Sequence, residues 1–147
     1  MRHEYVHKAV NQIYPIINFG EFGAISEAMA DYFSMASFWA EGKTISTLGN
    51  FIGTGEASAR NISGAAGSKV MPSSWTGEVH DDSLILSQAL YSLSGNGAHS
   101  LGAFTSGTFA WQQRSDVLVF NALFYFPDNF ANFRDALEMA CRRIEPN

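Results

Sequence analysis

The apolar periodicity of residues 23–40 is the feature that most constrains the fold. In this segment, GAISEAMADYFSMASFWA, apolar side chains recur every three or four residues. The stripe consists of Ile25, Ala28, Met29, Tyr32, Phe33 and Ala36. Such spacing predicts an amphipathic helix with one buried face. Strict two-residue alternation, which is typical of half-buried strands, is scarce in the rest of the chain, so a mainly α fold is predicted.

Further helices are predicted where breaking and capping residues bracket apolar segments. Pro15 ends the first of them, because the residue before a proline avoids helical geometry. Asp81 and Asp82 suit the positive N-terminal end of another helix, and Ser115 with Asp116 resembles an N-cap. The predicted ranges are 3–14, 55–61, 81–93, 115–126 and 129–143.

Composition excludes several classes of protein. With 147 residues, 46% of them hydrophobic, the chain is long enough for one domain with a real core. The net charge of −5 argues against a nucleic-acid partner. The most apolar run, VLVFNALFYF, is about half of the roughly 20 residues that cross a membrane, so no membrane span is expected. Cys141 is the only cysteine, which excludes an intrachain disulfide and a cysteine-based zinc ribbon.

The segment HEYVH places His3, Glu4 and His7 at the spacing of a zinc site. On a helix, residues four apart share a face, so both imidazoles can bind one ion while Glu4 reaches a water at that ion. A third ligand is expected from Glu27 in GAISEAMAD. Asp31, one turn later, is expected to accept the other N–H of His3. The alternative is a helix with two surface histidines and a solvated pair of acidic residues.

These motifs resemble the thermolysin-type and fungalysin-like zinc metallopeptidases of the gluzincin group. In that family, HExxH and GAxxEAxxD supply two histidine ligands, a general base, a glutamate ligand and a supporting aspartate, which implies these roles for His3, His7, Glu4, Glu27 and Asp31. GEVHDDSLILSQALYSLS is similar to the segment with the transition-state histidine, which implies His80. SARNIS resembles the stretch whose arginine binds the substrate carbonyl, which implies Arg60. The implied fold is a helical domain over residues 1–147, like the C-terminal domain of these enzymes.

The chain departs from the family pattern at two positions. The tyrosine that helps to stabilise the oxyanion falls at Asn18, and the aspartate that orients the transition-state histidine falls at Trp75. Tyr14 and Glu78 are the candidates to replace them. The alternatives are a packing role for Tyr14 and a plain loop carboxylate at Glu78.

The resemblance implies a zinc metalloendopeptidase that hydrolyses peptide bonds through a metal-activated water. It also implies secretion, a peptide or protein substrate, and a preceding β-rich domain whose edge strand binds substrate and which has no counterpart in residues 1–147. We therefore expect weak zinc binding, with His3 in the first helical turn, and little peptidase activity of the chain alone. The alternative is a non-catalytic helical module that binds a partner, or another copy of itself, through an exposed apolar face.

Overall fold

The computed structural model describes residues 2–14, 17–49, 60–65, 67–105, 107–110 and 112–145. The mainly α prediction is confirmed, since helices dominate the described residues and the only sheet among them has two short strands. The elements, in chain order, are α1 (Arg2–Val10), α2 (Gly20–Trp39), β1 (Thr47–Leu48), β2 (Arg60–Asn61), α3 (Val79–Leu93), α4 (Arg114–Ala122), the 3₁₀ helix η1 (Leu123–Tyr125) and α5 (Phe130–Ile144).

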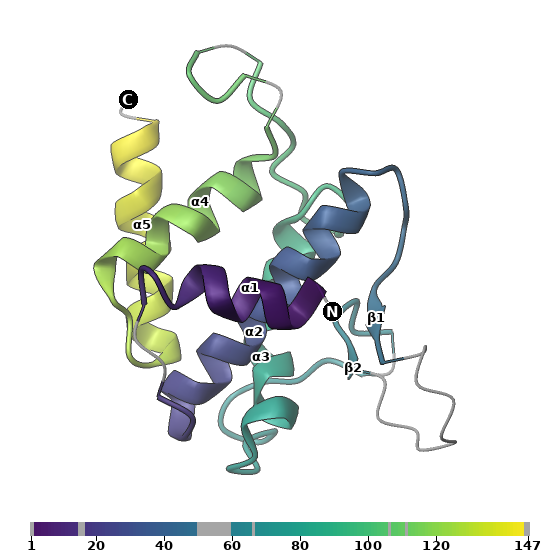
Figure 1. Cartoon of the computed structure of the whole chain (residues 1–147), viewed down its shortest axis with the longest axis vertical. Coiled ribbons are helices and arrows are strands. Elements are labelled where there is room, and N and C mark those ends of the chain that lie inside the picture. The colour runs from purple at the N-terminus through teal and green to yellow at the C-terminus, as the bar shows by residue number, and fades with distance from the viewer. Residues whose placement is uncertain are drawn as a thin grey trace.

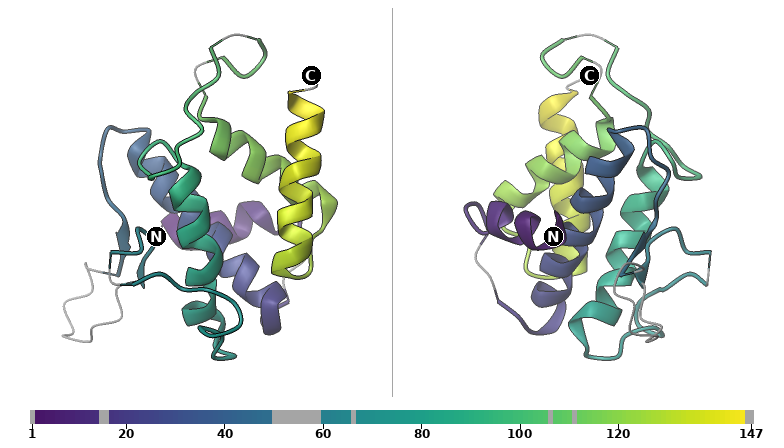
Figure 2. Two further views of the ribbon diagram at one scale, coloured as in Figure 1. Left: turned by 180° about the vertical axis from the view of Figure 1, so that it is seen from behind. Right: turned by 45° about the vertical axis from the view of Figure 1, so that its right-hand side comes forward.

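Helix α2 is the centre of the fold, and it includes the predicted helix 23–40 apart from the final Ala40, its C-cap. Helices α1 and α3 pack against it, while α4 packs against α5 (Figures 1 and 2). Because neighbours surround it, α2 buries every residue of the predicted stripe except Phe33, which is half-buried, and it buries further residues outside the stripe. Its buried residues also include Asp31, which has no exposed surface. The central core comprises Val10, Tyr14, Ile25, Ala28, Met29, Tyr32, Leu86, Leu90, Val119, Ala122, Leu123, Phe133 and Ala136.

A glycine allows the start of α3 to approach the start of α2. A Cβ atom on Gly23 would lie 2.8 Å from Val79 Cγ1 and 2.9 Å from the backbone carbon of Asn18. Both distances are shorter than real Cβ contacts, so a larger residue would push the two helix ends apart. His80 follows Val79 directly, and Gly23 therefore helps to determine where His80 lies.

Several predicted helix limits were wrong by a few residues. Helix α1 ends at Val10, and a turn follows it instead of further helix up to residue 14. Helix α4 begins at Arg114, after an N-cap at Gln113, so Ser115 lies inside the helix. The α-helix then tightens into η1, and Phe126 adopts the left-handed conformation with φ of 52°.

The predicted helix over residues 55–61 is wrong where it can be compared with the structure. Residues 55–59 lie outside the described residues, and Arg60 and Asn61 form strand β2. Strand β2 pairs antiparallel with β1, with Thr47 opposite Asn61 and Leu48 opposite Arg60. The prediction failed because this pairing joins residues distant in sequence, which helical periodicity does not detect.

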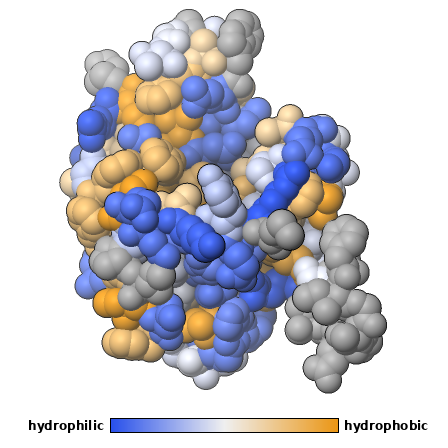
Figure 3. All heavy atoms as spheres, in the orientation of Figure 1, coloured by the Kyte–Doolittle hydropathy of each residue, from blue (hydrophilic) through white to orange (hydrophobic). Residues whose placement is uncertain are grey.

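The surface combines hydrophilic areas with exposed aromatic side chains. Figure 3 shows hydrophobic surface over α4, above a largely hydrophilic strip over α1. Exposed large apolar residues in this part of the chain include Phe120 on α4, Phe124 in η1, and Phe126. Among the described residues, no helix combines the length and the hydropathy that a membrane crossing requires.

Candidate metal centre

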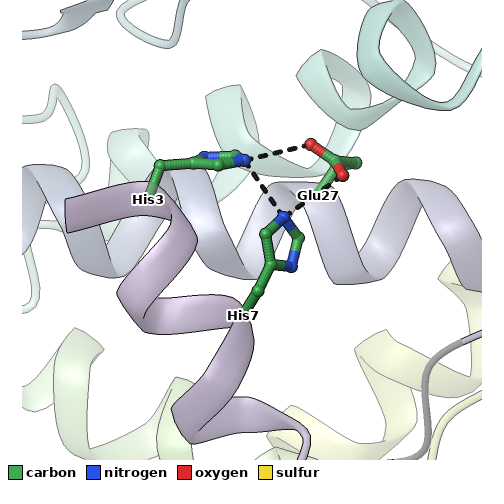
Figure 4. A group of neighbouring side chains, drawn as sticks. All are labelled: His3, His7 and Glu27. Carbon is green, nitrogen blue, oxygen red and sulfur yellow. Dashed lines mark hydrogen bonds and ion pairs between the residues drawn. The ribbon is translucent and has the colours of Figure 1, made fainter. Parts of the chain in front are cut away.

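Three side chains from two helices converge on one point beside α2. His3 and His7 lie one turn apart on α1, and Glu27 faces them from α2 (Figure 4). The two Nε2 atoms are 3.0 Å apart. His3 Nε2 lies 3.2 Å from Glu27 Oε2, and His7 Nε2 lies 3.2 Å from Glu27 Oε1. The structure therefore brings together the three residues that the sequence assigns to metal binding. These residues, His3, His7 and Glu27, could hold one metal ion, and they are called the metal cluster below.

The separations fit a small tetrahedral ion. Zinc–nitrogen and zinc–oxygen bonds of about 2.1 Å at tetrahedral angles place neighbouring ligand atoms about 3.4 Å apart. The observed separations of 3.0–3.2 Å are close to this value. Glu27 Oε2 is buried and has no hydrogen-bond partner among the described residues, although it lies beside His3. An ion between the three groups would satisfy this oxygen, so the residues present fit a zinc ion.

Burial and neighbouring charges shift the pKa values of His3 and Glu27 in opposite directions. Burial alone lowers the pKa of His3, but the carboxylates of Asp31 and Glu27 outweigh this effect and raise the pKa to about 9. Burial raises the pKa of Glu27, but contacts with His3 and His7, helped by the charge of His80, hold it well below its usual range. The Glu27 carboxylate therefore favours the charged form of the His3 imidazole, and His3 favours the charged form of Glu27.

Asp31 lies against His3 as the sequence predicts, but the predicted hydrogen bond from the His3 N–H is not formed. Its Oδ1 lies 3.0 Å from His3 Nδ1, a close contact that is poorly directed as a hydrogen bond. Arg60 binds the same carboxylate with two hydrogen bonds, from Nη2 to Oδ1 at 2.6 Å and from Nε to Oδ2 at 2.9 Å. Ser83 on α3 donates to Oδ2 at 3.4 Å. The alternative of a solvated acidic pair is wrong, because Asp31 is fully buried and the Glu27 side chain is 15% exposed.

The first turn of α1 is held by contacts that sequence reasoning missed. Arg2 Nη1 donates to Ser37 Oγ at 2.9 Å, and Arg2 Nη2 forms an ion pair with Glu41 at 2.5 Å. The Arg2 guanidinium also stacks over Phe38, 3.8 Å from the ring centre. These contacts join α1 to the C-terminal end of α2 and oppose the fraying expected at His3. No local signal in the sequence pairs Arg2 with residues about 35 positions away.

His80 faces the metal cluster from the first turn of α3. Its Nε2 lies 3.6 Å from Glu27 Oε2, and its Nδ1 lies 2.6 Å from Glu78 Oε1. Glu78 is also the N-cap of α3, since it accepts hydrogen bonds from the backbone N–H groups of His80 and Asp81. Of the two alternatives for Glu78, the structure therefore favours the residue that orients His80.

Tyr14 has the packing role that the sequence left as an alternative. Its side chain is 1% exposed, stacks on Phe22 and donates a hydrogen bond to the Pro127 carbonyl. Trp75, one of the two positions that depart from the family pattern, packs edge-to-face against Phe130. Both rings therefore pack within the fold, and neither has a described contact with the metal cluster.

An open cavity of about 830 Å³ adjoins the metal cluster. Glu4, Arg60 and His80, the three residues predicted to act in catalysis, all line it together with His3. Its other lining residues are Arg2, Tyr5, Ser34, Met35, Phe38, Ile45, Thr47, Leu48 and Gly49. The structure thus gathers every predicted site residue at or beside one cavity, with Asp31 buried beneath it.

Asp31→Asn is expected to weaken zinc binding by about 10–100-fold, because it removes the anionic contact to His3. It is also expected to lower the free energy of unfolding by about 3 kcal/mol, since Arg60 loses its buried counter-ion. Calorimetric zinc titration and urea unfolding measure the two effects. Asp116→Asn is the matched control: burial raises the pKa of this carboxyl on α4, and its partner is Tyr32. Equal zinc affinity in both variants would contradict the role of Asp31.

Comparison with known proteins identifies no family for this chain. No protein-family model matches it, and no curated protein matches it significantly. The resemblance to gluzincin peptidases therefore stays a prediction from the motifs.

Proposed function

We propose that this chain is a zinc-dependent metalloendopeptidase domain. One observation carries the proposal: two Nε2 atoms and a carboxylate converge within 3.0–3.2 Å of one another, and one of the three residues, His3, lines a cavity together with Glu4, Arg60 and His80. Three protein ligands with space beside them are typical of a catalytic zinc site, whereas structural zinc sites are closed by four.

The residues around the cavity can divide the steps of peptide hydrolysis between them. A bound Zn²⁺ supplies Lewis-acid chemistry, which lowers the pKa of water towards about 7 and polarises a carbonyl group. Glu4 takes a proton from the attacking water while the water oxygen forms a bond to the carbonyl carbon. Glu4 then delivers this proton to the amide nitrogen as the carbon–nitrogen bond breaks.

In the proposed reaction, Arg60 and His80 stabilise the oxygen that becomes negative. Asp31 engages Nε and Nη2 of Arg60, and no described residue pairs with Nη1, which remains a donor on a side chain that lines the cavity. The Glu78 carboxylate contacts Nδ1 of His80 at 2.6 Å and orients the ring, whose Nε2 faces Glu27. Donors of this kind typically contribute about 10²–10³ in rate.

Removal of the metal tests the proposal. The chain stripped with a chelator is expected to leave β-casein intact, and one equivalent of Zn²⁺ is expected to restore slow cleavage at internal peptide bonds. Mg²⁺ is the control ion, because it prefers six oxygen ligands and releases its bound water molecules reluctantly, so a site with two histidines suits it poorly.

Two results would contradict the proposal in different ways. Cleavage that persists after chelation would exclude zinc chemistry. Stoichiometric zinc binding without any cleavage would favour the alternative of a non-catalytic helical module.

A further inference from the structure

Strand β1 has a backbone edge that does not face β2. The Ile62 N–H donates to the Ser46 carbonyl at 2.9 Å, and the next pair in register is Thr47 with Asn61. In an antiparallel ladder, hydrogen-bonded pairs alternate with pairs whose N–H and C=O groups point outward. The Thr47 N–H and C=O therefore point away from β2.

The opposite edge of the pair is covered. The Asn61 carbonyl, which points away from β1 by the same alternation, accepts a hydrogen bond from Gln88 Nε2 on α3 at 3.3 Å. Strand β2 thus lies on the helix side of the pair, and β1 lies on the outer side (Figure 1). Among the described residues, no hydrogen-bond partner of the Thr47 backbone is found.

The residues of this strand belong to the wall of the cavity at the metal cluster. Residues 47–49 line the cavity from the strand side, while His3 and Glu4 line it from α1. Ile45 and Met35 add apolar surface between the two sides. A chain that lies along β1 would thus pass the residues to which we assign the chemistry.

We propose that β1 is the substrate-docking strand of this site: an extended peptide pairs its backbone with the N–H and C=O of Thr47. This inference rests on the proposed function and adds the substrate class, which is a polypeptide in extended conformation. Strand addition takes affinity from main-chain hydrogen bonds. This chain then contributes a substrate-binding edge of its own, whereas the family resemblance implies such an edge only in a preceding β-rich domain.

Equilibrium binding to a catalytically inactive chain tests the proposal. The zinc-loaded Glu4→Gln protein is titrated into fluorescein-labelled β-casein, an extended polypeptide, and anisotropy gives Kd. A second substitution, Thr47→Pro, removes the outward N–H without removing a ladder hydrogen bond, and is expected to raise Kd roughly 3–10-fold. Thr47→Val is the matched control, because it keeps the N–H and the shape of the side chain, and its Kd should stay within about twofold.

Amide hydrogen exchange gives a second measurement that needs no proline. In the zinc-loaded Glu4→Gln protein, β-casein is expected to slow exchange at Thr47 while exposed Thr44 is unaffected. Unchanged exchange at Thr47, no binding of β-casein, or equal Kd for the proline and valine variants would each overturn the docking role of β1. Cleavage by the wild-type chain is measured separately. Thr47-dependent binding without cleavage would refute only the peptidase function, and cleavage with Thr47-independent binding would refute only the role of β1.

Discussion

Glu4→Gln is expected to lower the rate of zinc-dependent peptide hydrolysis by about 10²–10⁴-fold, while the affinity for zinc stays within about twofold. Glu4 lies between the two histidines in sequence and lines the cavity, yet it is exposed and is not part of the metal cluster. The amide of glutamine has nearly the same shape but cannot take a proton from water. The substitution therefore separates proton transfer from metal binding.

The measurement is the initial rate of β-casein cleavage at matched zinc occupancy, with occupancy checked by calorimetry. Glu138→Gln is the control, because Glu138 lies on α5, is largely exposed and lies outside the cavity. Loss of the acidic residue from the first turn of α1 costs only about 0.3–1 kcal/mol of helix stability, so unfolding should not explain a lost rate. Equal rates for Glu4→Gln and the wild-type chain would remove Glu4 from the mechanism.

Glu27→Ala is expected to weaken zinc binding by about 10²-fold or more. Structural zinc sites with four protein ligands bind the ion with about 10–16 kcal/mol, so one ligand contributes roughly 3 kcal/mol. Glu27 is the only one of the three clustered residues on α2, so its loss leaves two histidines on a single turn of α1. Such a pair is also common on helices that bind no metal.

Calorimetric titration of the chelator-stripped protein with Zn²⁺ measures this effect. The wild-type chain is expected to bind one ion, because the Arg2 contacts hold the first turn of α1 that was expected to fray and to weaken zinc binding. Glu27→Ala is expected to show no stoichiometric binding at the same concentrations. Glu138→Ala is the control for removal of a carboxylate, and far-ultraviolet circular dichroism confirms that both variants fold. If Glu27→Ala binds zinc as tightly as the wild-type chain, the assigned site is wrong.

The sequence was sufficient to place the two histidines on one helical face and the two acidic residues on another, because each spacing is a local property. His3 and His7 are four residues apart, so any α-helix places them on one face. The stripe through Ile25, Met29 and Tyr32 likewise requires a helix, and that helix carries Glu27 and Asp31 one turn apart. Both statements depend on helical period alone, and the structure agrees with them.

The limits of the helices were less predictable, because caps and tertiary contacts determine them. Helix α3 begins at Val79, two residues earlier than predicted, since the Glu78 side chain accepts the first backbone N–H groups. The region around Arg60 was predicted as helix, and it is a strand because its partner lies beyond an intervening segment of the chain. Local propensity does not encode such a pairing.

The sequence by itself determined a mainly α chain, a pair of histidines on one helical face, and two acidic residues one turn apart on another helix. Only the tertiary structure decided that Arg60 is the counter-ion of Asp31, that Arg2 anchors α1, and that Thr47 lines the same cavity as His3. The reason is physical: helical period relates residues a few positions apart, whereas these contacts join groups that only packing around α2 brings within a few ångströms.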